Sequence, residues 1–143
     1  MPPEAANPTA PPDESATQLA FTKKRVERVT TMYLEGRLRC DSLPYRCDEP
    51  TGQGTIVLCY LGDDLVRGEA LNEATDGPAR ETYYYDGEEH YATVVEGREP
   101  GDAAAVSYLF AGNLIERSGP DRSERFGQER IRQVATTGTP SCP

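Results

Sequence analysis

Apolar and polar positions along the chain predict a mainly β fold. Short apolar runs recur at residues 55–61 (TIVLCYL), 82–85 (TYYY), 90–95 (HYATVV) and 106–110 (VSYLF). Runs of this length, rich in β-branched and aromatic residues, are typical of buried or half-buried strands. Glycine, with Asp or Asn, separates them at short intervals, which is the pattern of tight turns. We therefore expect an antiparallel meander, or an open barrel, of β-hairpins.

Two segments favour short helices at the ends of this sheet. The first segment, residues 19–33, has Thr22 as a candidate N-cap. It carries apolar side chains at helical spacing, namely Leu19, Val26, Val29 and Tyr33. Residues 26–34 also have the composition of a strand, so both interpretations are open at this point. Residues 123–134 form the second candidate helix, and Gly127 lowers the helical propensity there.

The two ends of the chain differ from the middle and set the domain boundaries. Residues 1–18 contain five prolines and three acidic residues and have almost nothing to bury. Such a segment cannot offset the entropy that ordering costs. We predict a disordered Pro-rich tail at residues 1–18, one β-hairpin domain at 19–135 and a C-terminal tail at 136–143. With 143 residues in all, the chain has room for one modest core.

A repeated unit of an aromatic residue, a turn and a strand organises the middle of the chain. It occurs at residues 33–38 (YLEGRL), 60–65 (YLGDDL), 85–88 (YDGE) and 108–114 (YLFAGNL), and its tyrosines are 27, 25 and 23 residues apart. Each unit places an apolar strand end before a glycine that can adopt the positive φ of a hairpin turn. We predict four stacked hairpins. The alternative is that small β proteins place tyrosines and turn glycines about this often by chance.

The segments YYYDGEEHYATVVEG and YLFAGNLIE resemble the strand, Asp-Gly or Asn-Gly turn, strand units of MORN-variant proteins. They are also similar to uncharacterised exported bacterial proteins with repeated YYFDNGKL segments. The resemblance covers residues 33–116. It implies a β-meander, usually without catalysis, and it supplies no ligand and no catalytic residue. The chain departs from the pattern in having no strict period, few lysines and an inserted cysteine loop at residues 40–47.

The net charge of the chain limits the classes of partner that we expect. Twenty-four acidic and 15 basic residues give a net charge of −9, which repels nucleic acid and anionic membranes unless basic residues gather on one face. Two basic clusters exist: Lys23, Lys24, Arg25 and Arg28, and Arg122, Arg125, Arg130 and Arg132. They would suit an acidic partner or lipid head groups if they lie together, and solvated faces paired with local acids are the alternative. We expect no nucleic-acid partner and, since no apolar run is long enough, no transmembrane segment.

The four cysteines bear on the cellular compartment. None of them forms a C-x-x-C pair, and the single histidine cannot complete a recognisable metal set. We predict two disulfides, Cys40 with Cys47 and Cys59 with Cys142, among the three possible connectivities. Disulfides form in oxidising compartments, so we expect a periplasmic or secreted bacterial protein, with a lipid anchor on its N-terminal tail as one option. Four unpaired thiols in a cytosolic protein are the alternative.

The sequence contains few candidate catalytic residues or motifs. The chain contains no G-x-S-x-G, H-E-x-x-H, P-loop or G-x-G-x-x-G motif, so no motif supports the common hydrolase, metalloprotease or nucleotide-binding classes. His90 must carry any histidine-based mechanism, and an exposed turn histidine is its ordinary interpretation. The carboxylate pairs Asp63 with Asp64 and Glu88 with Glu89 are expected by chance in an acidic chain. We predict no catalytic residue, no cofactor and no metal site.

The tyrosines are better candidates than the charged residues for a binding surface. Because strand neighbours point to opposite faces, the triplet 83–85 must divide its rings between the two faces. Because the chain has few apolar residues, we expect only one face of the sheet to be covered. We therefore predict that an exposed tyrosine on the other face lies in a contact patch with an acidic rim. Its candidate binding residues are Tyr83, Tyr84, Tyr85, Tyr91, Asp86, Glu88 and Glu89.

These observations favour a non-enzymatic exported module that binds a protein or a glycan of the cell envelope. One alternative is a periplasmic inhibitor of lysozyme-like enzymes, whose small β-barrels carry a disulfide and a start similar to Tyr45-Arg-Cys47. The Ser-Gly and Lys-rich inhibitory loop expected of that class is missing. The other alternative is a small hydrolase that uses His90. Oligomeric state stays open.

Overall fold

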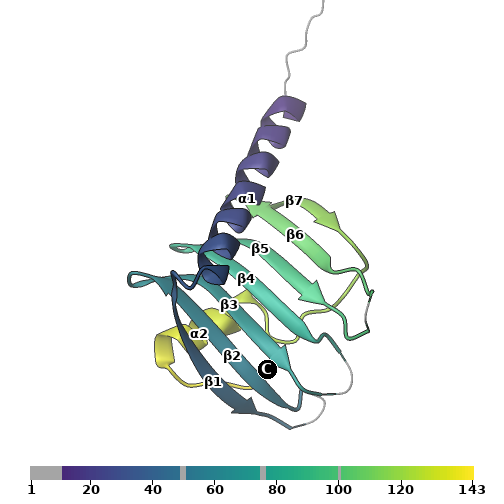
Figure 1. Cartoon of the computed structure of the whole chain (residues 1–143). Helices are drawn as coiled ribbons and strands as arrows, with labels where there is room; N and C mark the ends of the chain where they lie inside the picture. Colours follow the sequence, from purple (N-terminus) through teal and green to yellow (C-terminus); the bar gives the residue numbers. More distant parts are fainter. Residues whose placement is uncertain (1–10, 49–50, 75–76, 100) are drawn as a thin grey trace, which may run out of the picture.

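The computed structural model describes residues 11–48, 51–74, 77–99 and 101–143. In these residues seven antiparallel strands form one open sheet, in which every strand pairs with the next along the chain (Figure 1). The strands are β1 (Arg39–Arg46), β2 (Gln53–Leu61), β3 (Asp64–Asn72), β4 (Arg80–Asp86), β5 (Glu89–Glu96), β6 (Ala105–Phe110) and β7 (Asn113–Ser118). The predicted meander of hairpins is confirmed, and the sheet stays open instead of closing into a barrel.

Each face of the sheet carries one helix. α1 (Pro11–Leu34) crosses one face, and α2 (Gln128–Thr137) lies on the other (Figure 1). Val29 and Met32 of α1 are buried in a cluster with Tyr84 and Tyr91. A second cluster on the opposite face buries Ile131 and Val134 of α2 with Ile56, Leu58, Tyr83 and Tyr85. The expectation that only one face is covered is therefore wrong. Neither described helix has the combination of length and hydropathy that crossing a bilayer requires.

α1 is longer than the sequence pattern predicts. The helical interpretation of residues 19–33 is confirmed, and the strand interpretation of residues 26–34 is wrong. The predicted disordered tail is wrong for residues 11–18, since α1 begins at Pro11, and residues 1–10 lie outside the described residues. Prolines suit a first turn because its N–H groups have no helical partner. Thr22 is an interior position and not the N-cap, and its hydroxyl donates to the Gln18 carbonyl at 2.8 Å.

Three of the four repeat units are tight hairpin turns. They connect β2 to β3, β4 to β5 and β6 to β7, and Gly62, Gly87 and Gly112 in them have φ of 63°, 60° and 83°. Because alternate connections of a meander lie at the same end, these three turns share one end of the sheet. The fourth unit, residues 33–38, is not a hairpin. It ends α1, with Gly36 at φ 72°.

The pairing register shifts in each of these three hairpins, next to the tyrosine of the repeat. The shifts fall between Cys59 and Tyr60, between Tyr84 and Tyr85, and between Tyr108 and Leu109. In each case the second strand has one extra residue, which leaves Val66, Tyr91 and Ile115 without a register partner. Such bulges bend the strand and re-aim a side chain. Here Val66 and Tyr91 both join the cluster beneath α1.

Two disulfides are present, but their connectivity differs from the prediction. Cys40 bonds to Cys59, directly opposite on β2 with a Cα–Cα distance of 4.0 Å, and Cys47 bonds to Cys142. The predicted Cys40–Cys47 bridge is wrong because β1 is extended. Seven residues of strand separate two Cα atoms by roughly 23 Å, far beyond disulfide reach. The C-terminal segment is tied by Cys142 to the end of β1 instead of to β2.

Candidate functional site

The four tyrosines predicted to line a contact surface are all buried. Tyr83, Tyr85 and Tyr91 are at most 1 % exposed and Tyr84 is 5 % exposed. Tyr83 and Tyr85 face α2, whereas Tyr84 and Tyr91 face α1. Burial raises the pKa of Tyr83, Tyr85 and Tyr91 above the usual value. The predicted exposed tyrosine is therefore wrong, because helices on both faces leave no open side of β4 for a ring.

The acidic residues predicted to rim that surface bind the two helices instead. Arg25 of α1 reaches Asp86 at 3.0 Å and Glu89 at 3.4 Å, and its guanidinium lies 4.0 Å from the Tyr91 ring centroid. Arg132 of α2 donates to the Glu88 carbonyl at 2.8 Å and pairs with its carboxylate at 3.6 Å. Both helices thus hold the tip of the β4–β5 hairpin in place.

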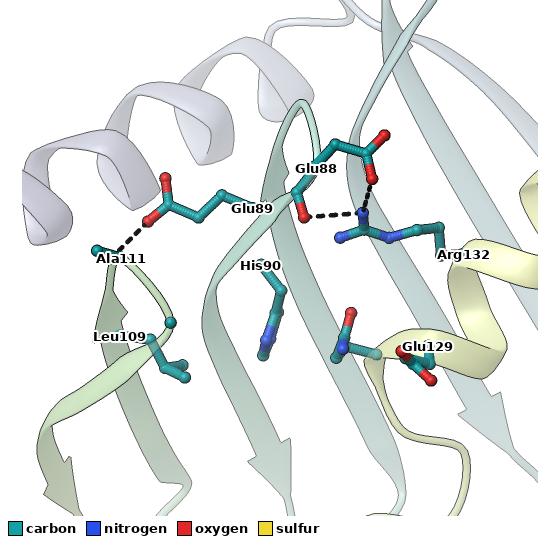
Figure 2. Close-up of a pocket in the computed structure, with 9 residues that line it drawn as sticks. Glu88, Glu89, His90, Leu109, Ala111, Glu129 and Arg132 are labelled. Carbon is teal, nitrogen blue, oxygen red and sulfur yellow. Dashed lines mark hydrogen bonds and ion pairs between the residues drawn. The ribbon is translucent and has the colours of Figure 1, made fainter.

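A cleft of about 740 Å³ opens beside this tip. It lies between the β4–β5 hairpin, the β6–β7 hairpin and the first turn of α2 (Figure 2). Its lining comprises Glu88, Glu89, His90, Leu109, Ala111, Gly112, Gln128, Glu129 and Arg132. The volume falls in the range of ligand-binding pockets. Three predicted site or candidate residues, Glu88, Glu89 and His90, therefore do lie together, but at this cleft.

His90 forms part of the cleft wall, between Leu109 and the first turn of α2 (Figure 2). Its Nε2 is 2.6 Å from the Thr93 hydroxyl, and the ring also hydrogen bonds to the backbone of Ala92. Burial lowers the pKa of His90 to about 4, with a smaller opposing effect of the Ala92 bond. The imidazole is therefore neutral at pH 7. It is a half-buried structural residue, and the interpretation as an exposed turn histidine is wrong.

The β6–β7 turn is shaped for its contact with Glu89. Ala111 has φ 52°, and with Gly112 it gives two consecutive residues with positive φ, as a type I′ turn requires. In this conformation the Ala111 N–H points at Glu89 and donates to its Oε2 at 3.1 Å (Figure 2). One carboxylate, Glu89, thus links α1 through Arg25 to both hairpins of the cleft.

Acidic side chains outnumber basic ones in the cleft lining. Three carboxylates and one guanidinium line it. Glu88 and Glu89 have the partners given above, but Glu129, in the first turn of α2, forms no ion pair with any described residue. The Oε1 of Gln128 is buried and has no hydrogen-bond partner among the described residues. An acceptor in this state favours a donor from outside the chain.

A buried carboxylate that the sequence analysis missed supports the α2 side of the cleft. Glu81 is fully buried, and its Oε1 accepts hydrogen bonds from the Tyr83 hydroxyl at 2.8 Å and from the Arg125 and Phe126 N–H groups at 2.8 and 2.9 Å. Burial raises its pKa, more than these bonds lower it. Glu81 thus anchors the loop that enters α2. An acid directly before the apolar run of β4 was the available signal.

Metal ligands are not clustered in the part of the chain that the structure describes, where no group of three or more His, Cys, Asp or Glu could hold an ion. The pair Asp63 and Asp64 lies at the β2–β3 turn, apart from the cleft lining. No family model, no curated protein and no solved structure matches the chain, so the resemblance to MORN-variant proteins stays a prediction.

Proposed function

We propose that the chain is a non-enzymatic binding module, and that its cleft receives a cationic group, the side chain of an arginine or lysine on a partner protein. The observation that carries the proposal is the buried Gln128 Oε1, which has no partner among the described residues, beside the exposed, ion-pair-free carboxylate of Glu129 in a cleft with net negative lining. A guanidinium is planar and presents five N–H donors, so one group can satisfy both acceptors.

The acidic balance of the chain supports the same partner. A net charge of −9 attracts a basic segment over distances of about a Debye length, which is about 8 Å at physiological ionic strength. The cleft walls are also in place before a partner binds, because the two hairpin tips are fixed by Arg25, Arg132 and the Ala111 N–H. A preformed site loses little conformational entropy when the partner binds.

A glycan of the cell envelope is the less favoured ligand. Glycan sites commonly offer the face of an aromatic ring, and the cleft lining contains no Tyr, Phe or Trp. The carboxylates could accept sugar hydroxyls, but they gain more from a charged donor, since charge-assisted hydrogen bonds are roughly twice as strong as neutral ones.

We further propose that the protein functions outside the cytoplasm. Its two disulfides support this, because such bonds persist in oxidising compartments and are rare in the reducing cytosol. The test is to express the chain with and without export in an otherwise identical host and to count free thiols by mass spectrometry of the non-reduced protein. Cytosolic protein that folds and binds its ligand with four free thiols would overturn this part of the proposal.

The binding proposal is tested with a fluorescein-labelled peptide of alternating arginine and glycine, followed by fluorescence anisotropy. Glu129→Gln should weaken binding about tenfold or more, since a hydrogen bond to a charged group contributes about 1.5 to 3 kcal/mol. The matched control is Glu99→Gln, which removes the same charge from an exposed position outside the cleft and should change the affinity by less than about twofold if surface charge contributes little. Equal losses in the two variants would show diffuse attraction and refute the site.

The two alternatives from the sequence make different predictions. An inhibitor of lysozyme-like enzymes would reduce lysozyme activity on bacterial cell walls at near-stoichiometric ratios, which the cleft proposal does not require. A hydrolase would turn over generic ester, glycoside or phosphate substrates and lose that rate in His90→Ala. We expect no His90-dependent turnover, because the His90 ring already hydrogen bonds to Thr93 and to the backbone of Ala92.

A further inference from the structure

A second groove, which shares no lining residue with the cleft, lies against α1. It has a volume of about 390 Å³ and is formed by the C-terminal half of α1 and the segment that leads into β1. Its lining comprises Lys24, Glu27, Arg28, Thr31, Met32 and Arg37. Three cations and one carboxylate give this groove a net positive lining on a chain whose net charge is −9.

Lys24 and Arg28 differ from their cationic neighbours in forming no ion pair with a described residue, although Glu27 lies in the same groove. Lys23 pairs with Glu116 at 3.5 Å, and Arg25 pairs with Asp86 at 3.0 Å. Lys24 and Arg28 form no ion pair with any other residue that the structure describes, although acids outnumber bases in the chain. The exposed cations left unpaired on α1 are thus both in this groove.

The two cations are one helical turn apart, on the same side of α1. Residues at i and i+4 have Cβ atoms about 5 to 6 Å apart, and like charges there destabilise a helix by a few tenths of a kcal/mol. An anion between Lys24 and Arg28 converts this repulsion into two attractions. Arg37 adds a third cation from the opposite wall, and one of its nitrogens, Nη1, bonds to Glu35 at 3.3 Å.

The helix end nearby does not oppose an anion strongly. The last carbonyls of a helix carry partial negative charge when they are free. Here the Thr31 carbonyl accepts the Glu35 N–H at 2.9 Å, and the Met32 carbonyl accepts the Arg37 N–H at 2.9 Å. The Thr31 side chain is exposed, so its hydroxyl is a further available donor.

From these contacts we infer that the groove binds a phosphate monoester. Three cations and Glu27 give the lining a formal charge of +2, part of which the ion pair of Arg37 with Glu35 offsets, and this positive lining attracts the −1.5 to −2 charge of a phosphate monoester at pH 7. The guanidinium of Arg28 can bind two phosphate oxygens at once, while Lys24 supplies a point charge. The same chemistry occurs in a soluble phosphate monoester and in a lipid headgroup such as phosphatidic acid.

The test titrates the full chain with inorganic phosphate at constant ionic strength and follows backbone amides by ¹H–¹⁵N NMR. Saturable shifts are expected at Thr31, Met32 and Arg37. Lys24→Gln with Arg28→Gln should raise the dissociation constant by about tenfold or more, since two charge-assisted bonds are lost. The matched control, Arg46→Gln with Arg117→Gln, makes the same charge change outside the groove and should stay within about twofold of the wild type.

Co-sedimentation with phosphatidylcholine vesicles, with and without phosphatidic acid, identifies the source of the phosphate. Binding that requires phosphatidic acid, Lys24 and Arg28 indicates a lipid headgroup, and binding of inorganic phosphate alone indicates a soluble ligand. Either result supports the site. Absence of saturable shifts at the groove, or equal weakening by the two double variants, would refute it.

Discussion

His90 couples the stability of the fold to pH. Its pKa is lowered from 6.5 to about 4 by burial, so the unfolded chain binds a proton more readily than the folded chain. The stability that this group contributes is therefore complete above pH 6.5 and is lost as the pH falls through 4. A difference of about 2.5 pKa units corresponds to up to about 3 kcal/mol.

This gives a prediction for His90→Gln, which keeps a polar side chain but does not titrate. In urea unfolding series at pH 7.5, 6, 5 and 4, the free energy of unfolding of the wild type should fall toward low pH more steeply than that of the variant. Parallel curves would contradict the assignment of a neutral, buried imidazole.

Glu81 acts in the opposite direction. Its pKa is raised by burial, so the stability it contributes is complete below about pH 4.5 and is lost as the pH rises through the folded-state pKa. We predict that Glu81→Gln removes this loss, because an amide oxygen can still accept from the Arg125 and Phe126 N–H groups. The unfolding free energy of the variant, measured between pH 4.5 and 7, should decline less than that of the wild type.

Glu81→Ala is the control for that prediction, because it removes the acceptor as well as the titration. It leaves the buried Phe126 N–H, the part-buried Arg125 N–H and the Tyr83 hydroxyl without this partner, and the buried N–H alone costs about 1 to 3 kcal/mol. A similar stability of the Gln and Ala variants at pH 7 would show that the hydrogen bonds to Oε1 contribute little.

At the scale of elements, α2 packs directly onto β3 at a glycine. A Cβ on Gly68 would overlap Cγ2 of Ile131, so the missing side chain is what lets the helix approach. We predict that Gly68→Ala destabilises the fold by about 1 to 3 kcal/mol, the usual range for overpacking. In Ile131→Ala the added methyl group has room, so Gly68→Ala should cost much less in that background. A double-mutant cycle by urea unfolding measures the coupling, and additive effects would contradict this packing.

The strands and the hairpin repeat were predictable from sequence because their signals are local. Apolar runs and turn glycines mark β2 and β4 to β6, and three of the four repeat units are hairpin turns with the same bulge. The unit at residues 33–38 shows the limit of the pattern, since a helix C-terminus and a hairpin both use a glycine with positive φ. The length of α1 was missed because two prolines resemble a tail as much as a first turn.

The site was less predictable because its residues meet only through tertiary packing. Glu88, Glu89 and His90 were singled out, but their cleft also needs Glu129 and Arg132 from α2. No local pattern brings those segments together. The tyrosine surface failed for the same reason, because the composition of β4 does not reveal that helices cover both of its faces.

At the scale of the whole molecule, the two disulfides should differ in their contribution to stability. Cys47–Cys142 closes a sequence separation of 95 residues, and Cys40–Cys59 closes one of 19. In the chain-entropy model the longer loop stabilises by about 1.4 kcal/mol more. We predict that replacing Cys47 and Cys142 by Ser lowers the unfolding free energy by more than replacing Cys40 and Cys59. The reverse order in urea unfolding would show that strand pairing, and not loop length, dominates.

The same two bridges also determine how the protein responds to proteases. Their spans overlap, since Cys47 lies between Cys40 and Cys59, so the chain from residue 40 to residue 142 is covalently closed. One cut anywhere in that range leaves both fragments joined, and they separate on a gel only after reduction. A cut in α1 instead releases an N-terminal peptide without any reductant. Nicking inside the sheet would therefore go unnoticed under non-reducing conditions, whereas loss of α1 would be visible at once.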